Sequence, residues 1–396
     1  MKVLHVNVRL SEGGAAGVAR TLCDELTTVG VDVTFAYGYG PNGAPSRLTV
    51  PYSSFQITPK LLAGVHRAAH LALGHESKFA FGPGWEQLKT AIHTSDVVHL
   101  HVLHSYYLNI HRLFALIKMY KKPVVWTLHD HWALTGRCAQ PAACDGWRAG
   151  CQSCPALKAY PPAAIDRASI EQPKRAEAIR QLQASVPTAV VACASWLGRQ
   201  AQEAGLTNVK VIENSVDRSF WNSAKELSPR PRDARPRKVL FLCRDLRDDK
   251  KVDWELLSQI GQLPNIALTI AGDHATIQVS NANHQPAVDS RSSLARLMTA
   301  HDTLLFTSTV DYYPLTVAEA LTAGMDILAC DSPALREFSV FPQVQIVDSP
   351  PGAYKALAES SFNRTERQPA EAAAFHPTRM ATEYLTTYES LTGITG

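Results

Sequence analysis

The stretch "MKVLHVNVRLSEGGAAGVAR", residues 1–20, indicates the fold class most clearly. Its opening alternates and predicts a strand at 2–8, and Gly13, Gly14 and Gly17 then form a loop before a helical stretch at 17–28. A strand that passes through a glycine-rich loop into a helix is the first half of a βαβ unit. The N-terminus therefore predicts a parallel α/β sheet, and we expect no signal peptide there.

Short apolar runs alternate with helical runs along the rest of the chain, which is typical of α/β proteins with parallel sheets. Further strands are predicted at 31–37, 96–101, 123–128, 188–194, 238–243, 266–271, 303–307, 326–329 and 345–347. Helices are predicted between them at 60–73, 84–93, 107–120, 166–185, 253–261, 292–299, 316–323 and 351–359, with a closing helix at 377–391.

The segment "SPRPRDARPR" separates two such series of strands and helices. Its prolines exclude a regular helix or a central strand. We therefore expect two Rossmann-like, doubly wound domains, at 1–216 and 238–376, joined by a linker at 217–237. Folds of this kind bind ligands beyond the carboxyl ends of their strands, so we expect a ligand in the cleft between the domains.

Bulk composition limits the classes of protein. The chain has 396 residues, 45% hydrophobic and 19% charged, which are values of a globular protein of about two domains. A net charge of only +3 argues against a nucleic-acid partner. The chain lacks an apolar run approaching the roughly 20 residues that span a bilayer, so we expect a cytoplasmic protein.

Four of the eight cysteines, Cys138, Cys144, Cys151 and Cys154, form a cluster in the sequence, called the cysteine cluster below. In a reducing compartment such a cluster favours a metal site or free thiols over disulfides. Four thiolates would hold a structural zinc, although only the final C-x-x-C has strong ligand spacing. Thiols packed around Trp147 without metal are the alternative, and both interpretations stay open.

Polar residues follow the predicted strands where a ligand would lie. The glycine loop can bring backbone amides and a helix N-terminus to an anion, or it can be a tight turn without a ligand. His129, Asp130 and His131 follow the strand at 123–128. There a neutral histidine can donate to or accept from a ligand hydroxyl and Asp130 could orient it, or all three simply close a strand.

A basic run follows the first strand of the second domain and contains Arg244, Arg247, Lys250 and Lys251. Arginine and lysine together can neutralise a leaving phosphate. Three aspartates interleave with these bases, so a solvated surface run is the alternative.

Two carboxylates, Asp311 and Glu319, flank Pro314 in "DYYPLTVAEALTAG". Pro314 can set the start of a helix, which places Glu319 in its second turn and leaves Asp311 in the loop beside unpaired amides. This arrangement suits hydroxyl groups at both ends and phosphate in the middle, or the two are ordinary loop and helix acids. A polar turn at 214–217, which contains Asn214, is a weaker signal.

Together these motifs resemble those of family-4 glycosyltransferases with the GT-B fold. The matching features are Gly13-Gly14, the turn at 214–217, Arg247 with Lys251, and Asp311 with Glu319. More narrowly, "NVRLSEGGAAGVA", "HVLHSYYLN", "WTLHDHWALTGRC", "GCQSCP" and "DYYPL" are similar to bacterial glycosyltransferases of colanic acid exopolysaccharide synthesis. The resemblance covers nearly the whole chain and implies that the helix in 377–396 crosses back to the first domain.

The resemblance implies a role for each matching residue. Glu319 would hold the ribose hydroxyls of a nucleotide sugar, Arg247 and Lys251 or its neighbour Lys250 would neutralise the diphosphate, and His129 would face the transferred sugar. Gly13 and Gly14 would help from the first domain, and Asn214 belongs to the turn. The sugar hydroxyls would be held by Asp311 and by the backbone of Tyr312, Tyr313, Pro314 and Leu315. The family usually has glutamate at Asp311 and glycine at Ser215, which leaves the choice of donor open.

The implied reaction is the retaining transfer of a hexose from a UDP- or GDP-linked donor to a lipid-linked oligosaccharide acceptor, without an essential metal cofactor. A non-catalytic nucleotide-sugar-binding subunit and a related GT-B enzyme such as a sugar-nucleotide epimerase are the alternatives. The stretch at 60–74 has apolar residues at helical spacing with basic ones between them. It could contact the cytoplasmic face of the inner membrane, or simply pack on the first domain.

Overall fold

The computed structural model divides into two compact units, one formed by Met1–Glu213 with Met380–Gly396 and the other by Asn214–Arg379. The structure describes residues 1–40, 48–74, 83–141, 144–227, 236–359 and 373–394. Each unit contains one parallel sheet with helices, which confirms the predicted α/β class.

The first unit is built on a seven-stranded parallel sheet with the order β3-β2-β1-β4-β5-β6-β7. Its strands are β1 (Lys2–Asn7), β2 (Asp32–Tyr37), β3 (Ser53–Gln56), β4 (Val97–Leu100), β5 (Val124–Leu128), β6 (Thr188–Ala192) and β7 (Val209–Val211). Strands β4, β5 and β6 are buried along their whole length, as expected for central strands covered on both faces.

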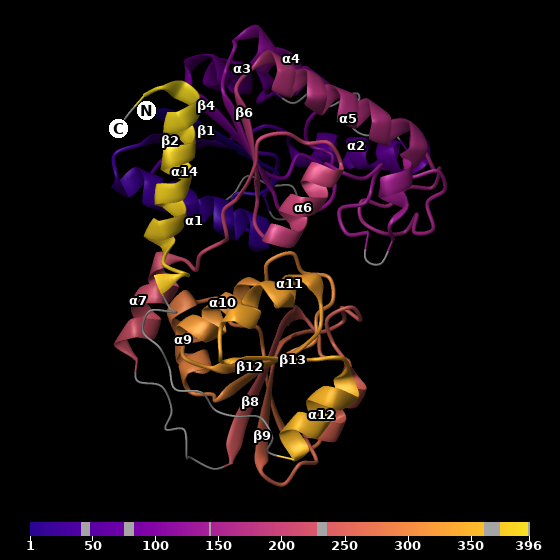
Figure 1. Ribbon diagram of the computed structural model, residues 1–396, viewed down its shortest axis with the longest axis vertical. Coiled ribbons are helices and arrows are strands. Elements are labelled where there is room, and N and C mark those ends of the chain that lie inside the picture. Colours follow the sequence, from indigo (N-terminus) through magenta and orange to yellow (C-terminus); the bar gives the residue numbers. More distant parts are fainter. Residues whose placement is uncertain (41–47, 75–82, 142–143, 228–235, 360–372, 395–396) are drawn as a thin grey trace. The chain divides into compact units, whose positions relative to one another are not determined.

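Helices surround this sheet (Figure 1). They are α1 (Gly14–Thr28), α2 (Lys60–Leu73), α3 (Trp85–Thr94), α4 (Ile110–Met119), α5 (Ala168–Ser185), α6 (Ser195–Glu203) and α14 (Pro377–Thr392). The helix predicted at 107–120 begins only at Ile110, because the Asn109 side chain accepts a hydrogen bond from the amide of Arg112 and caps it.

The last helix, α14, packs on the sheet of the first unit, and it is the yellow helix in Figure 1. Its Tyr384 and Tyr388 are fully buried. The Tyr388 hydroxyl lies 2.6 Å from Nδ1 of His99, and the Tyr384 hydroxyl lies 2.8 Å from Oγ1 of Thr127. Two buried tyrosines with paired hydroxyls therefore hold the end of the chain on strands β4 and β5.

The second unit is built on a six-stranded parallel sheet with the order β10-β9-β8-β11-β12-β13. Its strands are β8 (Arg237–Asp245), β9 (Ile266–Asp273), β10 (Ala282–Gln285), β11 (Thr303–Phe306), β12 (Asp326–Cys330) and β13 (Val344–Val347). Its helices are α7 (Arg218–Glu226), α8 (Trp254–Ile260), α9 (Arg291–Thr299), α10 (Leu315–Thr322), α11 (Pro333–Arg336) and α12 (Pro350–Ala358). Phe241, Leu257, Ile270 and Leu328 lie in one buried cluster of its core.

The linker predicted at 217–237 is wrong over its first half, because that half contains helix α7. The Asp217 side chain accepts a hydrogen bond from the amide of Phe220 and begins the helix, and Phe220 is completely buried. Burial of this apolar face holds α7 in the second unit. Most of "SPRPRDARPR", residues 228–235, lies outside the described residues.

The strand order places the carboxyl ends of particular strands next to one another. In the first sheet β1 lies between β2 and β4, and in the second sheet β8 lies between β9 and β11, so the order reverses beside β1 and beside β8. Loops that leave neighbouring strands in opposite directions at such a switch point open a space for a ligand.

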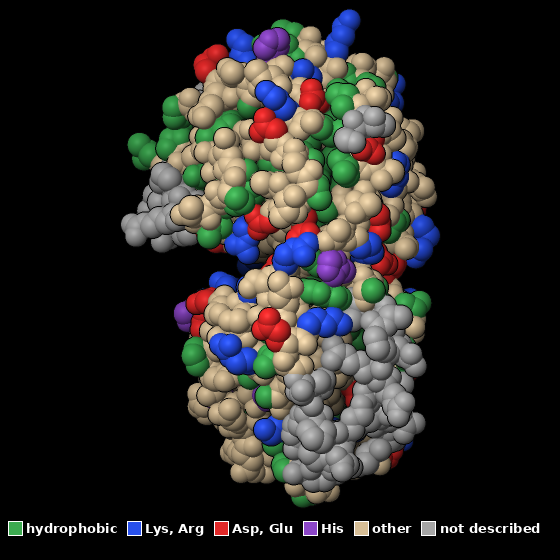
Figure 2. Space-filling view, turned by 90° about the vertical axis from the view of Figure 1, so that its left-hand side faces the viewer, with side chains coloured by type: hydrophobic (Ala, Val, Ile, Leu, Met, Phe, Trp, Pro, Cys, Tyr) green, Lys and Arg blue, Asp and Glu red, His purple; other side chains and the backbone are tan. Residues whose placement is uncertain are grey.

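Charged side chains of both signs are interspersed on the face shown in Figure 2. That mixture agrees with a net charge of only +3. Among the described residues, the structure contains no helix with both the length and the apolar character needed to cross a bilayer.

Candidate functional site

In the second unit, the loops after β8 and β11 bring Lys251 and Asp311 together. The Lys251 Nζ atom lies 3.2 Å from Oδ1 of Asp311, and the two side chains are 32% and 25% exposed. The Thr307 hydroxyl donates to the main-chain oxygen of Lys251, which fixes the lysine loop to the end of β11. The topology thus joins two residues that are 60 positions apart in the sequence.

The structure distinguishes the two adjacent lysines. Lys251 is half-buried and bonds Asp311, whereas Lys250 is exposed. Only Lys251 therefore points at the carboxylate after β11, a choice that the sequence left open.

Arg247 forms a pair with Asp245, not with the acids of the β11 loop. Its Nε and Nη2 atoms lie 2.9 and 2.7 Å from the two carboxylate oxygens. These hydrogen bonds hold the pKa of the Asp245 carboxyl far below its ordinary value. Both side chains are exposed, so a phosphate could displace Asp245 from the guanidinium at little cost.

Helix α10 begins after Pro314, which occupies the N-cap position. The ring of Tyr313 is buried against Phe338, with ring centroids 4.8 Å apart, and this contact anchors the loop between Asp311 and the helix. The described residues offer no side-chain cap to the helix and the amide of Val317 bonds Pro314, so the amides of its first two residues are the donors left for a ligand. Tyr312 and Leu315 lie on either side of this anchored segment.

Glu319 lies in the second turn of α10, as predicted, but it is buried and paired with Arg291. Arg291 begins α9 and also bonds Asp217, so one guanidinium joins two carboxylates. Burial raises the pKa of Glu319 and the charge of Arg291 opposes that rise. Arg291 was missed from sequence, because nothing local to α9 indicates carboxylates at positions 217 and 319.

Asn214 is buried, and its Oδ1 atom has no hydrogen-bond partner among the described residues. It lies on the short segment that leads to Asp217. Ser215, where the resemblance suggests a glycine, is not among the described residues with a positive φ, so serine fits the backbone here.

In the first unit, the loop after β1 presents an open helix N-terminus. Gly13 has φ of 94° and precedes Gly14, the first residue of α1. A Cβ atom added at Gly13, Gly14 or Gly17 would meet nothing within 4 Å. Among the described residues no side chain caps this helix, so an anion could bind at its positive dipole end.

His129 lies just beyond β5, as predicted, but its partner differs from the expected one. Its Nε2 atom lies 3.1 Å from Nδ1 of His101, whereas Asp130 accepts a hydrogen bond from His104 at 2.8 Å. The expectation that Asp130 orients His129 is therefore wrong, because the carboxylate bonds His104, in the loop after β4, and not His129. Burial lowers the pKa of His129 to about 4, with Asp130 acting weakly in the opposite direction.

His131, the third residue of that stretch, points elsewhere and bonds the side chain of Gln200 on α6. His104 and Trp132 instead line a hollow beyond β4 and β5. Its lining also includes Tyr106, Lys174 and Arg175. This hollow was not predicted, because its walls come from five separate segments of the first unit.

The cysteine cluster lies in a loop that Arg137 organises. Its guanidinium donates to the main-chain oxygens of Ala156 and Ala159 and lies 3.4 Å from Sγ of Cys154. Burial raises the pKa of the Cys138 and Cys151 thiols. Trp147 is buried in the same segment.

A tetrahedral zinc would need the four sulfurs about 3.8 Å apart. Within the described residues, the side chains that place three possible ligand atoms within 4.8 Å of one another are His5, His99 and His101, and the cysteine cluster forms no such group. The Cys151 sulfur accepts a hydrogen bond from the amide of Gly136 and the Cys154 sulfur one from Arg137, and zinc binding there stays a prediction.

Two kinds of comparison show what this chain is similar to, namely sequence relatives and solved structures. A family model described as Glycosyltransferase Family 4 matches residues 12–220. The chain is 32% identical over 410 residues to WcaC, a colanic acid biosynthesis glycosyl transferase of Escherichia coli (strain K12), covering 99% of this chain and 100% of that protein.

Solved structures match at the level of the fold. Sucrose-phosphate synthase from Thermosynechococcus elongatus matches with a TM-score of 0.66 at 14% identity, covering 99% of each chain. HepE of Anabaena matches with a TM-score of 0.60, at 13% identity for the complex with UDP and 14% for the complex with UDP-glucose, covering 99% of this chain and 100% of that chain. Both parallel-sheet units are thus those of the GT-B fold, and the chain belongs to glycosyltransferase family 4.

Proposed function

We propose that this protein is a retaining hexosyltransferase that uses a UDP- or GDP-linked sugar and a lipid-linked oligosaccharide acceptor in exopolysaccharide synthesis. The observation that carries the proposal is the Lys251–Asp311 pair at the switch point of the second sheet. A cation beside a carboxylate, next to an uncapped helix start, offers one group for phosphate and one for sugar hydroxyls.

Binding of the donor would break two ion pairs of the site and replace them with bonds to the donor. Its diphosphate would take Lys251 from Asp311 and Arg247 from Asp245, and a sugar hydroxyl would take the released Asp311. Both pairs are partly exposed, so their loss costs little, whereas the bond to a dianionic phosphate is stronger.

Glu319 would accept the ribose hydroxyls through Oε2, since Arg291 bonds Oε1 and the described residues provide no bond to Oε2. Arg291 keeps this buried carboxylate charged and oriented, which favours hydrogen bonds from neutral hydroxyls. The described first-unit residues suited to the donor are Gly13 and Gly14 at an anion and His129 at the transferred sugar.

Charge then determines the mechanism. The carbon–oxygen bond to the phosphate breaks as the sugar gains oxocarbenium character, and Lys251 and Arg247 stabilise the charge that develops on the departing phosphate. The acceptor hydroxyl attacks from the same face and gives its proton to a phosphate oxygen. No protein nucleophile and no metal cofactor are needed for this step.

The test is a panel of UDP- and GDP-sugars assayed for nucleotide release with a lipid-linked acceptor. Lys251→Ala should lower kcat about 100-fold, because it removes a charge that acts on the leaving group. Lys355→Ala is the matched control, since Lys355 is an exposed lysine of α12 that bonds only Glu359 at 3.9 Å among the described residues. Unchanged turnover in both Lys251→Ala and Glu319→Ala would refute the site, and donor binding without turnover would favour the non-catalytic alternative.

We also propose that the protein works at the cytoplasmic face of the inner membrane, through helix α2. Leu61 and Val65 are 83% and 55% exposed, while His66 and His70 on the opposite face are buried. The main chain of Leu71 and Leu73 bonds the segment around Ile165, which is also exposed. Leu61 and Val65, one turn apart, thus form an exposed apolar pair on one face of α2, and Leu71, Arg67 and Ile165 are exposed near the same helix.

Liposome sedimentation tests this contact. Leu61→Asp with Val65→Asp should reduce binding to vesicles that contain anionic lipid, and Val29→Asp, at an exposed apolar residue after α1, should not. Equal binding by all three proteins would contradict a role for α2.

A further inference from the structure

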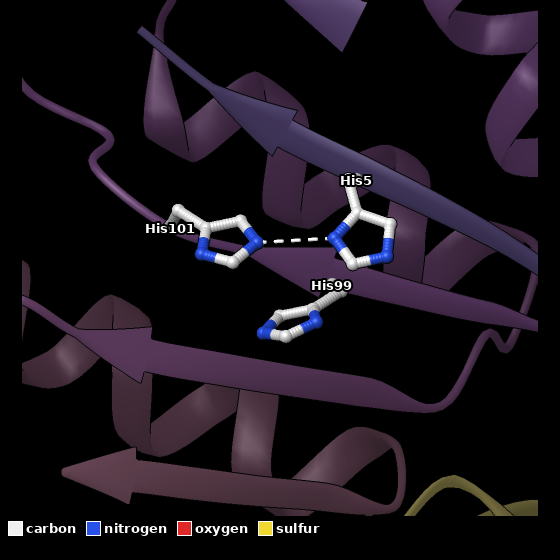
Figure 3. Close-up of side chains that lie close together, drawn as sticks. All are labelled: His5, His99 and His101. Atoms are coloured by element: carbon white, nitrogen blue, oxygen red, sulfur yellow. Dashed lines mark hydrogen bonds between the residues drawn. The ribbon is translucent and has the colours of Figure 1, made fainter. Parts of the chain in front are cut away.

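A row of histidines lies on one side of the first sheet, buried inside the first unit. His5 lies on β1 directly opposite His99 on β4, and His101 follows β4 on the same side. Figure 3 shows these three rings directed toward one another, with a hydrogen bond between His5 and His101. His129, beyond β5, continues the row, and its ring centroid lies 5.4 Å from that of His101.

Three of these rings form a continuous hydrogen-bonded chain. Nδ1 of His5 lies 3.1 Å from Nε2 of His101, and Nδ1 of His101 lies 3.1 Å from Nε2 of His129. His5 and His101 are fully buried, whereas His129 is half-buried. Burial lowers the pKa of each ring, to about 3 for His5 and about 4 for His129, so all three are neutral at pH 7.

Neutral rings restrict the direction of the chain. A neutral imidazole carries one N–H and one lone pair, so a ring that accepts on one nitrogen must donate from the other. Each link therefore points the same way. Either His5 donates to His101, which donates to His129, or every bond runs in reverse.

The outer nitrogen of His5, at the buried end of the histidine chain, selects between the two directions. Nε2 of His5 is buried and has no hydrogen-bond partner among the described residues. In the reverse direction this atom would carry a buried N–H without an acceptor, which native proteins rarely tolerate. In the forward direction it carries only an unused lone pair.

We propose that His5 and His101 are positioning residues that hold His129 in its Nδ1–H tautomer. Nδ1 is the ring nitrogen that the chain leaves for a ligand, so His129 presents a hydrogen-bond donor and not a base. This inference rests on the proposed function in one respect, namely that the ligand oxygen facing His129 belongs to the transferred sugar. A neutral donor there binds that oxygen without removing a proton, and the acceptor proton is left to the departing phosphate.

A metal ion is the other use that clustered imidazoles allow, and the bonds of His99 argue against it. Its Nδ1 atom is 2.6 Å from the hydroxyl of Tyr388 and its Nε2 atom is 2.8 Å from that of Thr127. Both nitrogens are thus engaged, and binding a metal would break one of these bonds. These two bonds also make His99 a control, because it is as deeply buried as His101 but is not part of the hydrogen-bonded chain of histidines.

The tautomer can be measured directly by NMR on protein labelled with ¹⁵N-histidine, with His129→Gln to assign the signals. At pH 7 His129 should show a protonated Nδ1 and an unprotonated Nε2. A protonated Nε2, or an averaged pair of signals, would overturn the proposal. Adding Zn²⁺ should leave the signals of His5, His99 and His101 unchanged, and a joint shift of the three would instead establish a metal site.

Substitutions in the histidine chain distinguish a role in positioning His129 from a role in packing alone. His5→Leu leaves the His101–His129 contact in place but removes the buried donor, so His129 should become a mixture of tautomers. His101→Leu should lower kcat about 10-fold, the effect of one lost hydrogen bond, with little change in KM. His101→Gln should restore most of it, since an amide can both donate and accept.

His99→Gln is the matched control and should retain the wild-type tautomer and kcat. If His101→Leu keeps full kcat, or if His99→Gln loses as much as His101→Leu, the positioning role is wrong. If the wild-type protein transfers no sugar at all, the proposed function fails, and the tautomer measurement still decides the chain of histidines.

Discussion

The two units place polar residues at the same topological position but neutralise them differently. In the second unit, beside β8 and β11, the groups are charged and each is matched by an opposite charge, as in Lys251 with Asp311. In the first unit, beside β1 and β4, histidines are buried together and lose their charge by desolvation. A site built from ion pairs can release its groups to a charged ligand, whereas a site built from neutral rings keeps a fixed pattern of donors and acceptors.

The largest expected effect is on the pH dependence of the free energy of unfolding, and it comes from the buried histidines of the first unit. The folded-state pKa of His5 is lowered to about 3 and that of His129 to about 4, below the value of about 6.5 in an unfolded chain. Between about pH 6.5 and pH 4 the unfolded state therefore binds protons that the folded state does not, and the free energy of unfolding falls as the pH falls. One such histidine contributes about 3 kcal/mol over this range.

Urea denaturation at several pH values measures this slope. His5→Leu should flatten it, and His93→Gln, at an exposed histidine of α3, should leave it unchanged. A slope that is the same in all three proteins would show that the buried rings are not the source.

A smaller effect is expected at the buried pair of the second unit. Arg291→Met leaves the carboxylates of Glu319 and Asp217 without their cation, and burial then penalises both charges. Because the arginine is itself 32% exposed, we discount the full cost of a broken buried pair to about 2 kcal/mol. Thermal and urea unfolding check it, and a stability equal to wild type would mean that Arg291 does not hold the two acids.

The choice of donor should respond to Asp311, with a change of about tenfold in relative kcat/KM between two donor sugars. Asp311→Glu lengthens the side chain by one methylene and should move its carboxylate to another sugar hydroxyl. Competition between UDP-glucose and UDP-galactose measures the ratio. An unchanged ratio across the donor panel would remove Asp311 from donor selection.

The smallest effect is expected at the exposed pair. Arg247→Met breaks its bonds to Asp245, yet both side chains are solvated, so the unfolding midpoint should not change measurably. The contrast with Arg291→Met, measured under the same conditions, tests whether burial separates the two arginines. A loss of stability as large as that of Arg291→Met would contradict the distinction.

Much of the fold was predictable from local pattern. The central strands and most helices were found because burial on both faces or on one face leaves apolar runs with the period of a strand or a helix. The strands missed were the short edge strands β3, β7 and β10, where half-buried residues leave a weak pattern. Helix α7 was missed because its evidence is one cap and one buried Phe220 beside a proline-rich segment.

The α/β class, the presence of two domains and the position of polar residues after strands could be read from the sequence alone, since these depend on neighbours along the chain. Three pairings required the three-dimensional structure: Arg291 joins Asp217 to Glu319, Lys251 and not Lys250 bonds Asp311, and His101 instead of Asp130 bonds His129. These partners lie between 28 and 74 positions apart, and the order of strands in each sheet brings them together. Local periodicity carries no record of that order, because it reports which face of an element is buried and not which element lies beside it.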